Sequence, residues 1–193
     1  PRVGGQVSGP QRSTDVVAVL FTDLVGSTAL WAGLGEAAAG KLRRAHDNVL
    51  LIAVESHGGK VIKGLGDGIM ASFDGAGDAV AAAVAIQQGI QRRNRRSPTP
   101  LGVRIGISVG DVTWENADCF GPPVVEASRL CEAAAEGQIL VAELVRAMAR
   151  GRGGHQFHPV GELELKGLPA PLPALAVSWS ATEPQSLPPA LAR

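Results

Sequence analysis

The sequence has few of the features that mark secreted, membrane or disulfide-rich proteins. Two cysteines in 193 residues are too few for the disulfide framework of a small secreted domain, and Cys119 and Cys131 lack the paired spacing of a zinc site. No run approaches the roughly 18 continuous apolar residues of a membrane span, and the first residues have no apolar core like that of a signal peptide. We therefore expect a cytoplasmic chain without a membrane-spanning segment.

The chain also lacks an excess of charge of either sign. Lysine plus arginine and aspartate plus glutamate number 18 each, so no large field favours nucleic acid or an anionic membrane. The basic run 92–96 closes a predicted helix, where cations interact favourably with the helix dipole, and we interpret it as a solvated helix end. A phosphate-binding site, if present, must therefore be local.

The length fits one packed domain. Residues 1–14 and 180–193 are rich in glycine, proline and polar residues, and we expect both segments to be flexible. The folded domain is predicted over 15–179. The chain begins at Pro1 rather than at a methionine, which is consistent with a longer polypeptide that carries additional domains.

Hydrophobic periodicity gives a coarse secondary structure. Helices are expected from Ser27, as a candidate N-cap, through Trp31, and over 36–56, 76–93 and 120–135. Strands are expected over 16–21, 60–63, 68–73, 101–112, 138–141, 161–166 and 174–177. The order βαββαβ predicts an α+β fold, a ferredoxin-like sandwich of mostly antiparallel sheet with helices on one face and additional C-terminal strands.

Two phosphate-binding signatures come close and fail. Residues 35–41 have the glycine and lysine spacing of a P-loop, but Leu42 stands where serine or threonine is required. Gly64, Gly66 and Gly68 do not form a dinucleotide-binding loop, because Ile69 replaces the third glycine of that pattern and the segment is predicted as a hairpin.

Five other segments occur together in an order that identifies a family. They are FTDLVGST (21–28), KGLGDG (63–68), VRIGISVG (103–110), DCFGPPVVEASRL (118–130) and ELKGL (164–168). In order and spacing they resemble the class III adenylyl and guanylyl cyclases, over about residues 15–179, and they are most similar to soluble bacterial adenylyl cyclase domains. The resemblance implies the class III nucleotidyl cyclase fold and the conversion of ATP to cyclic AMP and pyrophosphate.

The resemblance also implies a two-metal site. The metal-binding aspartates of the family match Asp23 and Asp67, which would hold two divalent cations, Mg²⁺ or Mn²⁺, with the oxygen ligands that such ions prefer. The phosphates would be held by backbone amides at a helix N-terminus, where free N–H groups favour anions. The matching residues are Val25, Gly26, Ser27 and Thr28.

The remaining roles also follow from the resemblance. Lys63 and Asp118 match the pair that reads the base, and a lysine donor with an aspartate acceptor suits adenine rather than guanine. Arg129 matches the arginine that stabilises the transition state. Arg104 and Lys166 match residues that reach the β- and γ-phosphates, although for Lys166 a surface ion pair is an open alternative. The family assembles each site from two chains, which implies a head-to-tail homodimer.

The sequence departs from the family at two positions. Val125 stands four residues before Arg129, where an asparagine is expected, and it offers no hydrogen bond to the ribose. Ser108 replaces a common histidine, which we interpret as a structural difference. Two hypotheses follow: a slow adenylyl cyclase, and a catalytically degenerate domain that binds nucleotide or mediates regulatory dimerisation. The presence of Asp23, Asp67 and Arg129 together favours the first.

Overall fold

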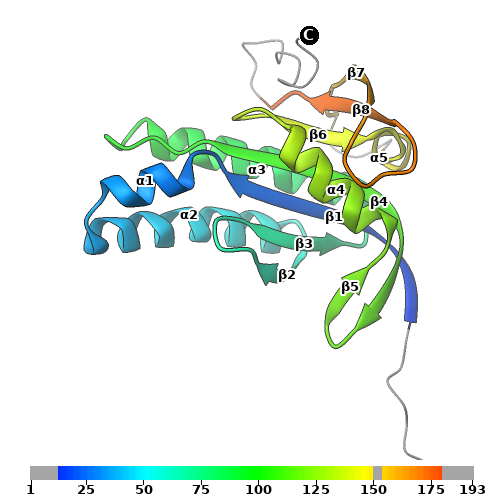
Figure 1. Cartoon of the computed structure of the whole chain (residues 1–193), viewed down its shortest axis with the longest axis horizontal. Helices are drawn as coiled ribbons and strands as arrows, with labels where there is room; N and C mark the ends of the chain where they lie inside the picture. Colours follow the sequence, from blue (N-terminus) through cyan, green and yellow to red (C-terminus); the bar gives the residue numbers. More distant parts are fainter. Residues whose placement is uncertain (1–12, 150–153, 180–193) are drawn as a thin grey trace, which may run out of the picture.

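The computed structural model describes residues 13–149 and 154–179 (Figure 1). In this part of the chain eight strands form one sheet, in the order β2-β3-β1-β4-β6-β8-β7, with β5 paired to β4. The strands are β1 (Ser13–Leu24), β2 (Lys60–Gly64), β3 (Ile69–Phe73), β4 (Val103–Glu115), β5 (Asp118–Phe120), β6 (Ile139–Ala142), β7 (Phe157–Leu163) and β8 (Leu172–Val177). The helices are α1 (Ser27–Gly33), α2 (Glu36–Ser56), α3 (Ala76–Asn94), α4 (Pro122–Ala133) and α5 (Glu143–Met148).

Strand β1 is central and apolar on both faces. It pairs antiparallel with β3 and β4, so that Phe21 lies opposite Met70 on one side and Gly106 on the other. Ala18 and Leu20 belong to one buried cluster, and Val19 and Phe21 to a second. Because successive side chains of a strand point to opposite faces, this alternation shows that both faces of β1 are covered.

The two faces of the sheet are covered by different helices (Figure 1). Helices α2 and α3 pack with the first cluster, as expected for the βαββαβ core. Helix α4 packs with the second cluster through Ala127 and Cys131, so the expectation of helices on one face is wrong for α4. Its backbone lies directly on β4, because a Cβ atom at Gly106 would overlap the carbonyl oxygen of Ala127.

The predicted C-terminal strands are present, with one shift. Strands β6, β8 and β7 extend the sheet beyond β4, and β8 matches the expected strand over 174–177. Strand β7 lies earlier than the expected 161–166, because Leu163 is its last residue and its final buried side chain. Lys166 therefore lies in a turn after the strand.

The predicted helix over 120–135 begins later because its first residues form a hairpin arm. Strand β4 turns at Asn116 and Ala117, which both have positive φ, into the short strand β5. Helix α4 then starts at Pro122, a residue suited to the first turn of a helix. The arm brings β5 into contact with β2 (Figure 1).

The predicted domain limits need a small correction at the first boundary. Ser13 and Thr14, assigned above to a flexible segment, belong to β1 and pair with Trp114 and Thr113. Residues 1–12 and 180–193 lie outside the described part of the chain. Among the helices that the structure describes, none has the length and apolar character needed to span a bilayer.

Candidate functional site

The two candidate metal-binding aspartates lie on neighbouring segments at one end of the sheet. Asp23 is near the end of β1, and Asp67 follows the turn after β2. The amide of Leu24 donates a hydrogen bond of 3.1 Å to the carbonyl oxygen of Asp67. Gly68 makes this approach possible, because a Cβ atom at that position would overlap the carbonyl oxygen of Thr22. Gly68 is therefore needed for the backbone contact between the end of β1 and Asp67.

This contact predicts that Gly68→Ala will damage the site and the fold together. The added methyl group must displace backbone atoms, and we expect a loss of about 3 kcal/mol in the free energy of unfolding. Gly64→Ala is the matched control, because a Cβ atom at Gly64 meets nothing within 4 Å. Urea unfolding of both variants measures the difference; equal stabilities would contradict the proposed close approach.

Asp67 is held by two side chains of α1. The Ser27 hydroxyl donates to Asp67 Oδ2 over 2.6 Å, and the Trp31 indole Nε1–H donates to Oδ1 over 2.9 Å. Burial raises the pKa of Asp67. The two hydrogen bonds and the charges of Arg43 and His46 together lower it by more than burial raises it, so the pKa lies below its ordinary value. Asp67 is thus held as a carboxylate, the form that binds cations.

The structure corrects the role expected for Ser27 as a helix cap. Gly26 occupies the N-cap position of α1, with a φ of 68°, and no side chain caps the helix. The Ser27 hydroxyl is instead bonded to Asp67. The four expected phosphate-binding amides also differ from one another, because the amide of Val25 already donates to the carbonyl oxygen of Gly102 over 2.8 Å.

Asp23 is paired with the arginine expected to reach the phosphates. Arg104 lies directly opposite Asp23 on β4, and its Nη2 and Nε lie 2.6 and 2.8 Å from Asp23 Oδ2. A third donor, Arg104 Nη1, bonds the carbonyl oxygen of Glu132 over 2.7 Å. The guanidinium therefore links the end of β1 to the last turn of α4.

Lys63 and Asp118 form an ion pair although they are 55 residues apart. Lys63 Nζ donates to Asp118 Oδ2 over 2.6 Å, and both side chains are partly exposed. Strand β2 supplies the lysine and β5 the aspartate. The Phe120 ring lies below the ammonium group, with 6.0 Å between Nζ and the ring centroid. A donor and an acceptor are thus presented side by side at the surface.

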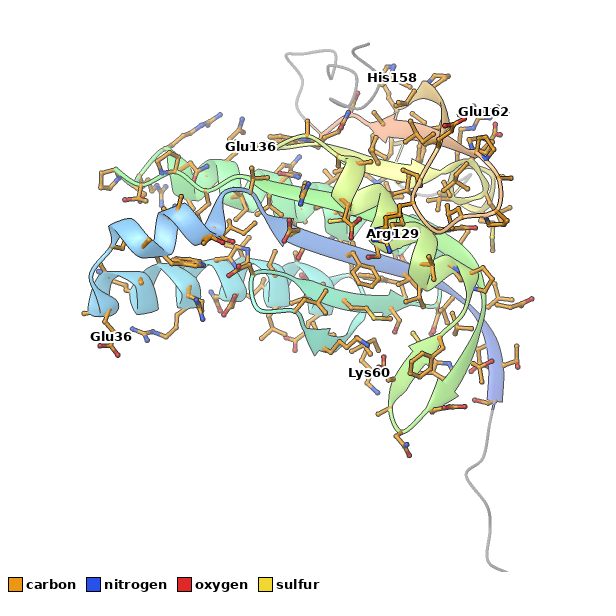
Figure 2. All side chains as sticks on the ribbon, viewed as in Figure 1. Glu36, Lys60, Arg129, Glu136, His158 and Glu162 are labelled. Carbon is orange, nitrogen blue, oxygen red and sulfur yellow. The ribbon has the colours of Figure 1, made fainter. Side chains whose placement is uncertain are left out.

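Arg129 lies on α4 (Figure 2), one turn after Val125 on the same helix. Arg129 Nη1 donates to both carboxylate oxygens of Glu132 over 2.7–2.8 Å, whereas its Nε is buried without a partner. Val125 is 41% exposed. Ser108 is fully buried under this helix, where its hydroxyl donates to the carboxylate of Glu126. Ser108 on β4 thus has a hydrogen-bond partner on α4.

The structure thus brings most, but not all, of the predicted residues into contacts. In the first group, Asp23 is paired with Arg104 and Asp67 accepts a hydrogen bond from Ser27. In the second group, Lys63 is paired with Asp118. No hydrogen bond or ion pair between described residues connects Lys166 to either group. Trp31 was missed by sequence reasoning, although its spacing of four residues from Ser27 places both on one face of a helix.

The donor set suits hard divalent cations. Asp23 and Asp67 offer carboxylate oxygens, the ligands that Mg²⁺ and Mn²⁺ prefer. Within residues 13–149 and 154–179, no group of three or more histidine, cysteine, aspartate or glutamate side chains forms a metal site. Two carboxylates alone leave most coordination positions open, as expected where substrate oxygens and water complete the shell.

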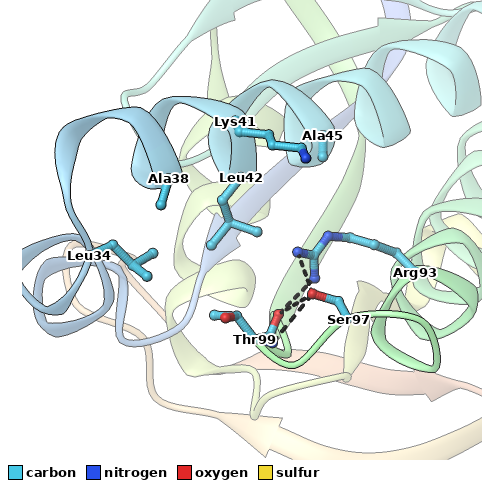
Figure 3. Close-up of a pocket in the computed structure, with 8 residues that line it drawn as sticks. All are labelled: Leu34, Ala38, Lys41, Leu42, Ala45, Arg93, Ser97 and Thr99. Carbon is cyan, nitrogen blue, oxygen red and sulfur yellow. Dashed lines mark hydrogen bonds between the residues drawn. The ribbon is translucent and has the colours of Figure 1, made fainter.

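A separate pocket of about 260 Å³ lies between α2 and the segment after α3 (Figure 3). Leu34, Ala38 and Leu42 form its apolar side, and Arg93 donates hydrogen bonds across its other side to Ser97 and to the Thr99 carbonyl oxygen. None of the predicted site residues lines this pocket. It is therefore distinct from the groups described above.

Comparison with known proteins connects these groups to a single family. The model of the adenylate and guanylate cyclase catalytic domain matches residues 10–176. An adenylate cyclase of Streptomyces coelicolor is 34% identical over 125 residues, which are 65% of this chain and 32% of that protein. The chain spans about 30–54% of the lengths of the curated relatives compared with it.

Solved structures agree with the fold. The adenylyl cyclase CyaB from P. aeruginosa superposes with a TM-score of 0.79 at 24% identity, covering 88% of this chain and 97% of that one. The adenylate/guanylate cyclase/hydrolase from Silicibacter pomeroyi gives a TM-score of 0.77 at 28% identity, with 86% and 98% covered.

Proposed function

Because the chain belongs to the adenylate and guanylate cyclase catalytic domain family, we propose that it converts ATP to 3′,5′-cyclic AMP and pyrophosphate. The observation that carries this proposal is the 2.6 Å contact between Lys63 and Asp118. Adenine presents an acceptor at N1 and a donor at its 6-amino group, whereas guanine presents the reverse pattern at these positions. A lysine, which only donates, beside a carboxylate, which only accepts, complements adenine.

We assign the metal ions and phosphates to the end of β1. Asp23 and Asp67 would hold two Mg²⁺ or Mn²⁺ ions, which supply activation of the ribose 3′-hydroxyl and charge neutralisation at the phosphates. Arg104, which is paired with Asp23 in this structure, is assigned to a β- or γ-phosphate oxygen of the bound nucleotide. Gly26, Ser27 and Thr28 carry the amides best placed for phosphate, since the Val25 amide is bonded to Gly102. For Lys166 two roles stay open, that of a phosphate ligand and that of a residue in a surface ion pair.

We propose that two copies complete the sites head to tail. Lys63, Asp118 and Arg129 of one chain would serve the metal-binding aspartates of the other, with Arg129 stabilising the transition-state phosphate. Large apolar side chains are exposed on or next to the elements that carry these residues. Leu65, in the turn after β2, is 45% exposed, Phe120 on β5 49% and Val125 on α4 41%. Exposed apolar groups around a polar site favour coverage by a second protein surface.

A second candidate function rests on Val125. Valine at this position cannot donate a hydrogen bond, so the domain would bind nucleotide and dimerise without efficient turnover, as a regulatory module of a longer protein. We favour a slow enzyme, because Asp23, Asp67, Lys63, Asp118 and Arg129 are all present.

We further propose a cytoplasmic location, where Cys119 and Cys131, both free and buried, remain reduced.

The deciding experiment is cyclic AMP formation from Mn²⁺-ATP at high protein concentration, where dimers should form. We expect slow product formation by the wild type and none by Asp23→Ala, which removes a metal-binding carboxylate. Mn²⁺-GTP serves as the competing substrate. If the wild type forms no more product than Asp23→Ala, the proposed cyclase activity is contradicted. If it then binds ATP without converting it, the regulatory module is supported.

A further inference from the structure

Helix α1 is attached to the rest of the molecule by few contacts. It has seven residues, none of them fully buried, and no side-chain cap. Leu30 and Trp31 pack partly against the core. Among the described residues, the side-chain hydrogen bonds between this helix and the rest of the protein are those of Ser27 and Trp31, and both end on Asp67.

The geometry at Asp67 fixes the carboxylate at both oxygens. Ser27 Oγ is 2.6 Å from Oδ2, and Trp31 Nε1 is 2.9 Å from Oδ1. Each ionised oxygen accepts more than one partner, so a cation can still approach Asp67 from its other side. The indole is a donor only. It therefore orients the carboxylate without competing with it for a metal ion.

The indole is also contacted at the face of its ring. The guanidinium of Arg43 on α2 lies over the Trp31 ring, 5.0 Å from its centroid, a distance at which cations are attracted to aromatic rings. Asp67, Trp31 and Arg43 thus form a chain of contacts from the β2–β3 turn through α1 to α2.

We propose that Trp31 is a positioning residue that holds the Asp67 carboxylate in the orientation required to bind a divalent cation. The inference rests on the proposed function only in taking Asp67 as a metal ligand. Partners that orient a ligand from behind typically contribute a factor of 10–100 to metal affinity. Trp31→Phe keeps an aromatic ring against Arg43 and removes the N–H donor.

The test is Mn²⁺ binding, measured from the electron paramagnetic resonance signal of the free ion in the presence of a non-cyclisable ATP analogue. We expect Trp31→Phe to weaken Mn²⁺ binding about tenfold. The matched control is Trp179→Phe, which also removes an indole hydrogen bond, of 2.6 Å to the carbonyl oxygen of Gly137, and should leave the affinity unchanged. Equal Mn²⁺ affinities of wild type and Trp31→Phe, with both folded, would overturn the proposal.

Fluorescence gives a second measurement that does not depend on the folding of Trp31→Phe. In Trp114→Phe/Trp179→Phe, Trp31 is the only tryptophan, and paramagnetic Mn²⁺ bound at Asp67 should quench its emission at the concentrations that saturate binding. Binding without quenching would overturn the proposal. If the wild type forms no cyclic AMP, but Trp31 is quenched in Trp114→Phe/Trp179→Phe and Trp31→Phe binds Mn²⁺ more weakly, the positioning role is supported. Only the proposed activity is then rejected.

Discussion

Val125→Asn will raise the rate of cyclic AMP formation on the order of 10²-fold, the factor that one well-placed transition-state donor typically contributes. The side chain at 125 lies one turn before Arg129 on α4 and is 41% exposed. Asparagine offers both a donor and an acceptor at this exposed position, and the backbone of α4 need not move to present them. A gain of this size corresponds to about 3 kcal/mol in the activation free energy.

The measurement is kcat with Mn²⁺-ATP for the wild type, Val125→Asn and Val125→Ala. The alanine variant removes the apolar side chain without supplying a donor, so it separates relief of crowding from a new hydrogen bond. We expect no gain from Val125→Ala. An equal gain in both variants would show that the valine obstructs the site, and no gain in either would show that it is not the residue that limits turnover.

The sequence was sufficient to predict the central strands and the positions of the two aspartates. Val17–Phe21 is continuous and apolar because this part of β1 is buried on both faces, so its pattern is that of an internal strand. The turn between β2 and β3 is equally local, since glycines mark the bend and Asp67 follows it. Such features depend on neighbours in the sequence, which makes them predictable.

Other features depend on contacts between distant segments. The amphipathic pattern of α4 indicates that one of its sides is buried, but it does not indicate which face of the sheet it covers; the absence of a Cβ atom at Gly106 decides this. The ion pair of Arg104 with Asp23 follows from the register of β1 and β4. Neither arrangement is determined by local propensity, and both place residues of the candidate site.

The reciprocal exchange Lys63→Glu/Asp118→Lys will reverse the preference for ATP over GTP. The pair lies at 2.6 Å, so the exchange preserves an ion pair between β2 and β5 while it moves the acceptor to position 63 and the donor to position 118. Guanine N1–H then meets an acceptor and O6 meets a donor. A site that leaves buried polar groups unpaired with the wrong base loses several powers of ten in selectivity. Because Lys63 and Asp118 are partly exposed, we expect a smaller change, on the order of 10²-fold in the ratio of kcat/KM values.

The single variants show whether the effect belongs to the pair. Lys63→Glu alone places two carboxylates together, and Asp118→Lys alone places two ammonium groups together, so each should lose activity with both nucleotides through like-charge repulsion. The double variant should recover activity with GTP beyond what the single variants predict, which is the signature of two groups in contact. The Val125→Asn background supplies the signal needed to measure all four proteins. If the double variant is active and still prefers ATP, Lys63 and Asp118 do not read the base, and specificity must reside in other residues of the interface.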